Sequence, residues 1–361
     1  MKFQYCFLLW NILIHINILC STCKKWIVIT SINYPTQAIK QLSNLSEWHV
    51  LVVADKKTPT DWKCEQCTLL TLADQKKLGY AIYDYLPFNH YSRKNIGYLY
   101  AISHGAEIIY DTDDDNIPIY QNLSYLPEQY TGPLVKTKNS FCNIYNYFGN
   151  DTVWPRGFPL EEILSQTKKE KIKTTRHFPL IQQALVNNNP DVDAVFRLTR
   201  SSNINFYNTH ASLSLPAQTF CPFNTQSTFF HKKAFWGLLI PVSTKFRVCD
   251  IWRGYITQRL LWEIGGSLTF LPPQAFQERN PHNLLSDFID EQDLYIHSKR
   301  LVTQLKKTQL TNKTFEEKYL ALIQCLTEQH FYDPIEIKLA KAWLDDLKKL
   351  NYKMPQFSED K

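Results

Sequence analysis

Short runs of hydrophobic residues alternate with amphipathic segments through the first third of the chain. Apolar runs at residues 26–30 and 49–54, and a third short run at residues 68–71, predict buried strands. An intervening segment that begins at Pro35 and continues to about residue 48 has the pattern of a helix. This β–α–β alternation predicts a largely parallel sheet with helices on its faces.

A second helix is expected at residues 93–104, directly before another short strand at residues 108–110. Ser92 stands at the N-cap position of this helix, and Gly105 follows its last turn, where a left-handed residue commonly ends a helix. The apolar face includes the small residue Gly97, which allows the helix to pack closely on a sheet.

The strand at residues 108–110 runs into four closely spaced aspartates: Asp111, Asp113, Asp114 and Asp115. Carboxylates this close repel one another unless a hard cation lies among them, and oxygen ligands suit Mg²⁺ or Mn²⁺. An acidic run by itself is more often a solvated turn. The preceding helix changes that expectation, because Arg93 and Asn95 lie in its first turn, where free backbone N–H groups favour anions. Together the two segments predict a metal–diphosphate site.

Further polar residues follow the predicted strands at the same edge of the sheet. Ser31 and Asn33 come after the first strand, and Asp55 comes after the second. Ligands of parallel α/β sheets gather at the C-terminal ends of the strands, so these residues are candidate substrate contacts. Asp55 has two interpretations that stay open, an acceptor of hydrogen bonds from a base or ribose and a turn residue at a strand end.

Residues 131–224 are rich in Asn, Pro and aromatic side chains and lack clean periodicity, so we expect long ordered loops there. Within this segment Arg156 lies in a loop held by Pro and Gly, where its guanidinium is placed to contact a phosphate or a carboxylate. Asp191 and Asp193 precede a strand that we expect at residues 194–198, and that position favours a capping role for them.

Strands are predicted at residues 227–230 and 235–241, and a helix at residues 250–263. Asp250 begins this helix and Arg253 lies one turn later, which makes them neighbours. Asp250 has two interpretations, a helix cap, which its position favours, and a base that deprotonates an acceptor hydroxyl. The Lys-rich amphipathic helices that follow are interpreted as a packing or oligomer surface.

Composition sets the scale of the protein. The 361 residues are 44% hydrophobic and 20% charged, which fits one large α/β domain with an appendage or two domains. The net charge of +6 comes from well-mixed charges without a basic block, so we predict no nucleic-acid partner. The nine cysteines include the C-x-x-C pair Cys64 and Cys67, for which a local disulfide and longer bridges both stay open.

The N-terminus has the character of a targeting segment. Residues 3–23 contain no Asp, Glu, Lys or Arg and are mostly apolar. Two interpretations stay open, a cleaved secretory signal peptide and an uncleaved signal anchor in a membrane. Both direct the chain into the secretory pathway.

Several separated blocks of the chain resemble the STELLO family, also described as the DUF288 glycosyltransferases. The blocks are PFNHYSRKNIGYLYAISHGAEIIYDTDDDN, NYFG, VWPRGFPLE, LIQQALVNNNPDVDAVFRLTR, FNTQSTFFHKKAFWGLLIPVS and IWRGYITQRLLWEIGG. They occur in consistent order over roughly residues 26–290. The resemblance implies a GT-A-like, Rossmann-related α/β fold with a mixed, mostly parallel sheet flanked by helices. It also implies a single-pass type II membrane protein of the Golgi lumen; a soluble lumenal or secreted form after signal cleavage is the alternative.

The resemblance also implies roles for particular residues. GT-A enzymes hold Mn²⁺ with an Asp-x-Asp motif, which matches Asp113 and Asp115 here, with Asp111 and Asp114 in support. An acidic residue near the acceptor matches Asp250 better than Glu263. A late histidine that completes the metal shell in such enzymes matches His282, with His231 as the weaker candidate.

These observations lead to one expected reaction and two alternatives. A sugar passes from a nucleotide-sugar donor, expected to be UDP-linked, to a glycan or other hydroxyl acceptor. Mn²⁺ or Mg²⁺, Arg93 and Arg253 stabilise the departing nucleotide, and Asp250 acts as the base if the reaction inverts. The alternatives are a catalytically silent scaffold or trafficking factor for another glycan synthase and a nucleotide-sugar mutase. The expected organisation is a targeting segment at 1–23, a transferase domain at 24–290 and a helical C-terminal extension at 291–361.

Overall fold

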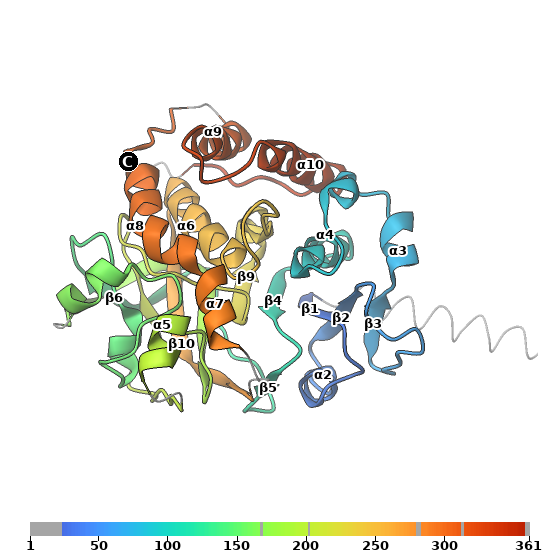
Figure 1. Cartoon of the computed structure of the whole chain (residues 1–361), viewed down its shortest axis with the longest axis horizontal. Helices are drawn as coiled ribbons and strands as arrows, with labels where there is room; N and C mark the ends of the chain where they lie inside the picture. The colour runs from blue at the N-terminus through green and yellow to red at the C-terminus, as the bar shows by residue number, and fades with distance from the viewer. Residues whose placement is uncertain (1–23, 167–168, 201–202, 279–282, 312–313, 358–361) are drawn as a thin grey trace, which may run out of the picture.

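The computed structural model describes residues 24–166, 169–200, 203–278, 283–311 and 314–357 (Figure 1). The predicted targeting segment at residues 1–23 therefore lies outside the described residues, as does His282. Among the helices that are described, none is both long enough and apolar enough to cross a bilayer.

The described part of the chain forms one mixed sheet of ten strands in the order β3-β2-β1-β4-β9-β7-β6-β8-β10-β5. The strands are β1 Lys25–Ser31, β2 His49–Ala54, β3 Cys67–Leu70, β4 Ile108–Thr112, β5 Asn116–Pro118, β6 Tyr130–Lys136, β7 Lys171–Asn187, β8 Leu213–Ser214, β9 Ser227–His231 and β10 Gly266–Gln277. The four strands β3, β2, β1 and β4 are parallel, as the alternating pattern of the sequence predicts. β9 is antiparallel to both β4 and β7, and β10 pairs with β7 in parallel.

Helices cover both faces of the sheet (Figure 1). They are α2 Gln37–Ser43, α3 Leu72–Lys77, α4 Lys94–Ser103, α5 Ala194–Thr199, α6 Cys249–Leu261, α7 Leu284–Asp290, α8 Gln292–Lys307, α9 Phe315–Glu328 and α10 Ile335–Lys349. Alternate residues of β1 enter different cores, because successive side chains of a strand point to opposite faces. Trp26 and Val28 join the larger core with α4 and α6, whereas Ile27 and Ile29 join a smaller core with α2.

The close approach of α4 to the sheet depends on Gly97. A Cβ atom at this position would lie 2.5 Å from Cγ2 of Val53 and 2.7 Å from Cγ1 of Val28. The helix ends as the sequence predicts, with Gly105 in the left-handed region at φ +82° just after the last turn. Its start is different, because a short 3₁₀ helix, Tyr91–Arg93, precedes α4 and Arg93 takes the N-cap position in place of Ser92.

Three predictions for residues 131–241 are wrong. The segment expected to be loops contains β6 and the 17-residue strand β7. β7 pairs with strands that are distant in the sequence, and such pairing leaves no periodic pattern in the segment itself. The strand expected at residues 194–198 is the helix α5, because Asp193 caps its N-terminus. The strand expected at residues 235–241 is largely a 3₁₀ helix, Lys232–Leu238.

The C-terminal helices pack against the rest of the structure. Both carboxylate oxygens of Asp346 in α10 accept backbone N–H groups, from Ala81 at 2.8 Å and Ile82 at 3.0 Å. The indole of Trp343 donates to the carbonyl of Trp236 at 3.0 Å, and Trp343 is fully buried. These contacts join the predicted extension to the large core.

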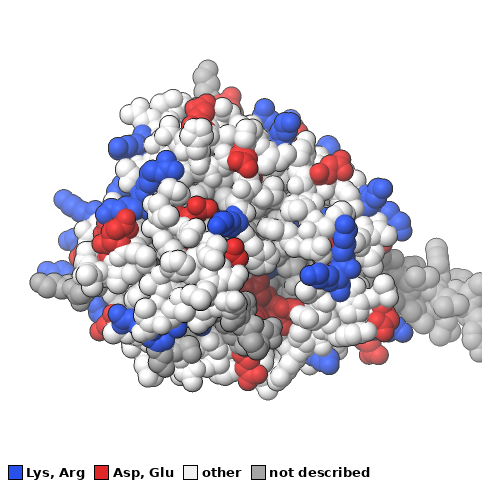
Figure 2. Space-filling model, in the orientation of Figure 1, with Lys and Arg blue, Asp and Glu red and all other residues white. Residues whose placement is uncertain are grey.

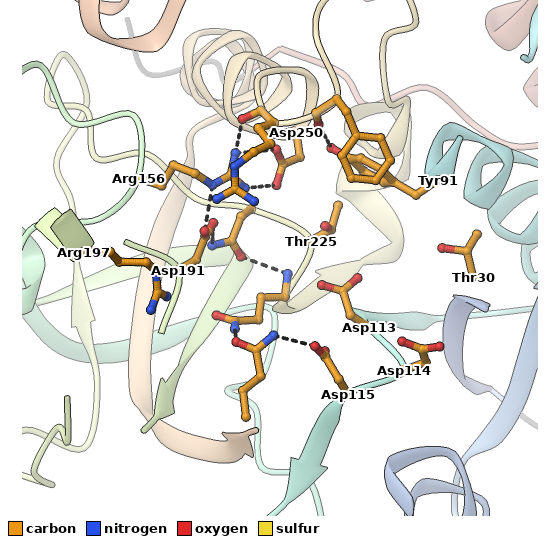
Figure 3. Close-up of a pocket in the computed structure, with 15 residues that line it drawn as sticks. Thr30, Tyr91, Asp113, Asp114, Asp115, Arg156, Asp191, Arg197, Thr225 and Asp250 are labelled. Atoms are coloured by element: carbon orange, nitrogen blue, oxygen red, sulfur yellow. Dashed lines mark hydrogen bonds and ion pairs between the residues drawn. The ribbon is translucent and has the colours of Figure 1, made fainter. Parts of the chain in front are cut away.

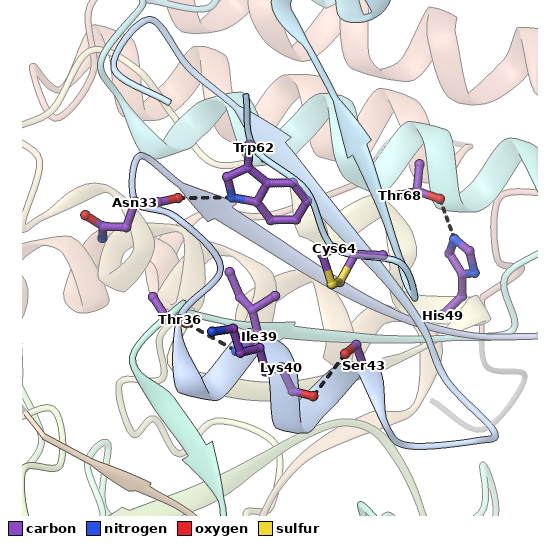
Figure 4. The surroundings of a disulfide bond; sticks show 10 residues. Asn33, Thr36, Ile39, Lys40, Ser43, His49, Trp62, Cys64 and Thr68 are labelled. Carbon is purple, nitrogen blue, oxygen red and sulfur yellow. Dashed lines mark hydrogen bonds between the residues drawn. A yellow bond between two sulfur atoms is a disulfide. The ribbon is translucent and has the colours of Figure 1, made fainter. Parts of the chain in front are cut away.

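The cysteines of the C-x-x-C pair form a local disulfide, Cys64–Cys67, at the start of β3 (Figure 4). Just before it in the chain, the indole of Trp62 donates to the backbone carbonyl of Asn33 at 3.0 Å. The segment around the disulfide therefore supports the loop that follows β1, which contributes to the site described below.

We predict that Gly97→Val destabilises the fold by about 1–3 kcal/mol, because the added methyl groups collide with the valines of β1 and β2. Chemical denaturation monitored by circular dichroism measures this change. Ser103→Val places the same side chain on the exposed side of α4 and is expected to change stability by only about 0.5 kcal/mol. Equal effects of the two substitutions would contradict the close packing described for Gly97.

Candidate functional site

A pocket of about 290 Å³ lies at the C-terminal ends of β1, β4, β7 and β10. Figure 2 shows acidic side chains inside a hollow in this face of the molecule. The charged lining residues are five aspartates and three arginines: Asp113, Asp114, Asp115, Asp191, Asp250, Arg156, Arg197 and Arg247. In Figure 3 the aspartates form two groups, with Asp113, Asp114 and Asp115 on one side and Asp191 and Asp250 on the other.

Asp115, in the first group, has one carboxylate oxygen with a hydrogen bond and one buried oxygen without. Its Oδ2 accepts a hydrogen bond from Nε2 of Gln277, at the end of β10, at 2.9 Å. Its Oδ1 is buried and has no hydrogen-bond partner among the described residues. Burial raises the pKa of the Asp115 carboxyl. A buried carboxylate oxygen without a partner costs free energy, and a bound cation would remove that cost.

Asp113, next to Asp115, is bonded to Lys94 and is also partly exposed. Nζ of Lys94 donates to Oδ1 of Asp113 at 3.1 Å, while 39% of the Asp113 side chain remains accessible. Its pKa rises to about 7: burial opposes the charge, Lys94 offsets part of this effect, and neighbouring Asp115 and Asp111 add repulsion. The protein by itself therefore neutralises this group of carboxylates incompletely.

Asp114 turns toward β1 and brings two predicted site residues into contact with it. Oδ2 of Asp114 accepts hydrogen bonds from Oγ of Ser31 at 2.5 Å and from Nδ2 of Asn33 at 3.1 Å. The hydroxyl of Thr36, which also caps α2, donates to the backbone carbonyl of Asp114. Ser31 and Asn33, which were predicted as substrate contacts, lie beside the acidic segment and hold its conformation, but neither of them lines the pocket.

Asp111 does not face the pocket, which corrects its predicted place among the metal ligands. Its side chain is 0% exposed and accepts hydrogen bonds from Lys94 at 3.0 Å and Arg253 at 3.2 Å. Arg253 is likewise buried, donates to Asp111 and to the carbonyl of Leu238, and does not line the pocket, so the structure does not offer its guanidinium to a departing nucleotide. These two residues join β4 to α6.

Three other residues that were predicted to contact the substrate are instead bonded within the protein: Arg93, Asn95 and Asp55. The buried guanidinium of Arg93 donates to the side-chain oxygen of Gln75 at 2.7 and 2.9 Å. The amide of Asn95 bonds the backbone of Ile240 in both directions. The carboxylate of Asp55 accepts backbone N–H groups, and none of the three residues lines the pocket.

Arg156 joins the two aspartates on the other side of the pocket. Its Nε donates to Asp191 at 2.7 Å, and its two terminal nitrogens donate to the two oxygens of Asp250 at 3.2 and 2.9 Å. The predicted contact of this guanidinium is thus made with carboxylates. Burial would raise the pKa of Asp191, but the attraction of Arg156 prevails and lowers it.

Asp250 lies in the first turn of α6 without capping it. The capping interpretation is therefore wrong, and the carboxylate is held at the pocket by Arg156.

Sequence patterns did not identify Asp191 as a pocket residue. Its neighbour Asp193 caps α5 through the N–H of Phe196 at 2.8 Å, as predicted for the motif, but Asp191 faces Arg156 and Asn224. The Asp-x-Asp spacing does not separate the two aspartates, because residues two apart in an extended segment point to the same side; the contact with Arg156 is what places Asp191 at the pocket.

The weaker candidates, His231 for a metal ligand and Glu263 for the acidic residue near the acceptor, have other contacts. Nε2 of His231 lies 2.9 Å from the carbonyl of Leu126 and 3.0 Å from Gln182, and this histidine does not line the pocket. Glu263 forms ion pairs with Arg259 and Lys318. Throughout the described ranges, no group of three or more His, Cys, Asp or Glu side chains is arranged to hold a metal ion. A metal would rest on the two carboxylates Asp113 and Asp115.

A mixed α/β sheet flanked by helices, with polar residues gathered at its strand ends, is consistent with the glycosyltransferase class of α/β folds. The comparisons agree: residues 247–361 match the family described as STELLO glycosyltransferases. The chain belongs to the STELLO family. This match includes α8, α9 and α10, which the sequence blocks did not cover.

Two similar relatives come from Arabidopsis thaliana, "Probable glycosyltransferase STELLO1" and "Probable glycosyltransferase STELLO2". Each is 35% identical over 353 residues, which covers 92% of this chain. The aligned region makes up 45% and 46% of these relatives, so the chain spans less than half of their length.

We predict that Lys94→Met destabilises the protein by about 3–5 kcal/mol, because it leaves the carboxylate of Asp113 without its ammonium and Asp111 with only Arg253. Urea denaturation measures this loss. Lys299→Met removes a comparable but exposed contact with Glu162, and it should cost no more than about 1 kcal/mol. A small effect of Lys94→Met would contradict the structural role assigned to this ammonium.

Proposed function

We propose that this protein is a metal-dependent GT-A-type glycosyltransferase that moves a sugar from a nucleotide-diphosphate sugar, UDP-linked, to a glycan or other hydroxyl acceptor. The observation that carries the proposal is the unpartnered, buried Oδ1 of Asp115 beside the partly open carboxylate of Asp113. Both belong to a pocket at the C-terminal ends of parallel strands, where α/β sheets bind their ligands.

The donor set fits Mn²⁺ or Mg²⁺. Such ions are commonly bound through one or two carboxylates, with substrate phosphates and water at the remaining positions, and so do not need a third protein ligand. Asp113 and Asp115 supply that number of carboxylates. When bound, the ion would offset the negative charge of the diphosphate leaving group.

The chain's own residues prepare this side of the pocket. Lys94 fixes one oxygen of Asp113, and Gln277 fixes one oxygen of Asp115, so that each carboxylate keeps its other oxygen for a ligand. Ser31 and Asn33 hold Asp114 against β1. This arrangement limits the conformations of the acidic segment before a ligand binds, which reduces the entropy cost of binding.

Asp250 is the proposed base on the acceptor side if the reaction inverts. The bidentate contact with Arg156 fixes the direction of the carboxylate. Each carboxylate oxygen has a second lone pair, so a substrate hydroxyl can donate to it. Arg93 and Arg253 have no part in this proposal, because both are bonded elsewhere in the core.

The same contact also favours a second candidate function, a catalytically silent member of the fold that scaffolds or traffics another glycan synthase. An arginine that bonds both oxygens of Asp250 occupies a hydrogen-bonding position on each oxygen, which leaves fewer positions for an acceptor hydroxyl. The two candidates differ in turnover: the enzyme hydrolyses or transfers the sugar of a bound donor, and the silent protein releases the donor intact.

We also propose a lumenal location in the secretory pathway, as a type II Golgi membrane protein or as its cleaved, soluble form. The uncharged, mostly apolar stretch at residues 3–23 supports entry into this pathway. The local disulfide Cys64–Cys67 fits an oxidising compartment.

We predict that Asp113→Asn and Asp115→Asn each weaken Mn²⁺-dependent binding of UDP by at least about tenfold, a loss of about 1.4 kcal/mol. Each substitution removes one negative carboxylate from the proposed cation site. Calorimetric titration at about pH 8, where a carboxyl of pKa about 7 is mostly ionised, measures the affinity.

Asp151→Asn is the matched control, because this exposed aspartate pairs only with Lys169 at the surface and should leave the affinity unchanged. Equal UDP affinity with and without Mn²⁺, or normal affinity in both pocket variants, would refute the metal–diphosphate site. Donor turnover by the unaltered protein then separates the enzyme from the silent scaffold.

A further inference from the structure

We propose that Tyr91 and Phe246 form an acceptor subsite for the apolar face of a neutral pyranose, beside Asp250. This inference rests on the proposed function and adds a substrate class to it. The two aromatic residues and Asp250 line the same pocket. Figure 3 shows Tyr91 and Asp250 near each other, apart from the three consecutive aspartates of the proposed metal site.

The aromatic shelf, defined as His90, Tyr91 and Phe246, consists of three rings in mutual contact. The ring of His90 lies parallel to the ring of Tyr91 at 5.3 Å, and the ring of Phe246 meets Tyr91 edge to face at 4.5 Å. Phe246 is nevertheless 51% exposed. Its neighbours hold the phenyl group in place while much of its surface stays open.

The segment that carries Phe246 is bonded to three other parts of the fold. The hydroxyl of Tyr91 donates to the carbonyl of Phe246 at 3.1 Å. Just before it in the chain, Lys245 donates to the carbonyl of Ile289 in α7 at 2.9 Å. Farther back, Glu336 of α10 accepts the N–H of Val242 at 2.6 Å. Because this loop is already held in place, a ligand that packs on the half-exposed phenyl group would pay little additional entropy cost for ordering it.

The ion pairs of Arg156 and Arg247 on this side of the pocket favour a neutral ligand. Arg156 is bonded to Asp191 and Asp250, and Arg247 is bonded to Glu291 at 2.6 Å. Both guanidinium groups are therefore already compensated by carboxylates of the protein. A phosphate or carboxylate on the acceptor would compete with those ion pairs and would face the negative charge of Asp250.

The mixture of an aromatic surface and polar groups matches the chemistry of a sugar ring. A pyranose presents C–H groups on one face, which pack on an aromatic ring, and hydroxyl groups around its rim. Asp250 and Thr225 also line the pocket and provide oxygen atoms that bond such hydroxyls. With its ring on the shelf, the sugar brings a rim hydroxyl toward the carboxylate proposed to deprotonate it.

The test measures binding of neutral gluco-, galacto-, manno- and xylo-oligosaccharides to the full chain, by saturation-transfer NMR and calorimetry, with and without UDP and Mn²⁺. We expect at least one of these oligosaccharides to bind. Phe246→Ala should weaken that binding by about tenfold or more, whereas Phe246→Tyr, which keeps the ring, should retain it. Both variants should bind UDP and Mn²⁺ like the unaltered protein.

Phe288→Ala is the matched control, since this phenylalanine of α7 is 36% exposed but does not line the pocket. It should leave oligosaccharide affinity unchanged. Unaltered affinity in Phe246→Ala would overturn the subsite, and so would the absence of oligosaccharide binding by a protein that binds UDP and Mn²⁺. Phe246-dependent binding of a short-chain polyprenyl phosphate in place of the oligosaccharides would also overturn it. If the unaltered protein bound an oligosaccharide but not UDP, the result would instead contradict the proposed donor site.

Discussion

The buried ammonium of Lys94 is the contact on which the arrangement of the site depends. It bonds the carboxylates of Asp111 and Asp113, and Asp111 in turn bonds Arg253, so that one chain of charges joins α4, β4 and α6. Each charge costs free energy to bury and is tolerated because its neighbours compensate it. This series of charges ends at Asp113, beside Asp115. There the negative charge is incompletely compensated, and these two carboxylates line the pocket.

This constraint divides the aspartates by the contacts they make. Asp111 is fully compensated and structural, whereas Asp113 and Asp115 each have one carboxylate oxygen without a hydrogen bond from the described residues. Across the pocket, Arg156 compensates Asp191 and Asp250 in a similar way. One side of the pocket is therefore incompletely neutralised, which supports the proposed cation and diphosphate. On the other side Asp191 and Asp250 are paired with Arg156, which supports the proposed neutral acceptor beside the aromatic shelf.

Much of the front half of the fold follows from local pattern. The strand at residues 49–54, the helix before the acidic segment and its Gly105 terminus were predicted within a few residues, because apolar runs and end signals act over short distances. The 17-residue strand β7 was missed. Its residues have no clean periodicity. β6, β9 and β10 all pair with it, and its C-terminal half is buried on both faces.

The sequence by itself determined the family, the β–α–β character of the front half and the acidic segment at the end of β4, since these depend on the order of residue types along the chain. Only the tertiary structure decided which polar side chains face the pocket. Arg93 and Arg253 have the charge that a nucleotide would attract, yet buried partners from distant segments hold them in the core. Asp191 reaches the pocket because Arg156, 35 residues earlier in the chain, is folded against it. Long-range contacts of this kind depend on packing, which no local pattern encodes.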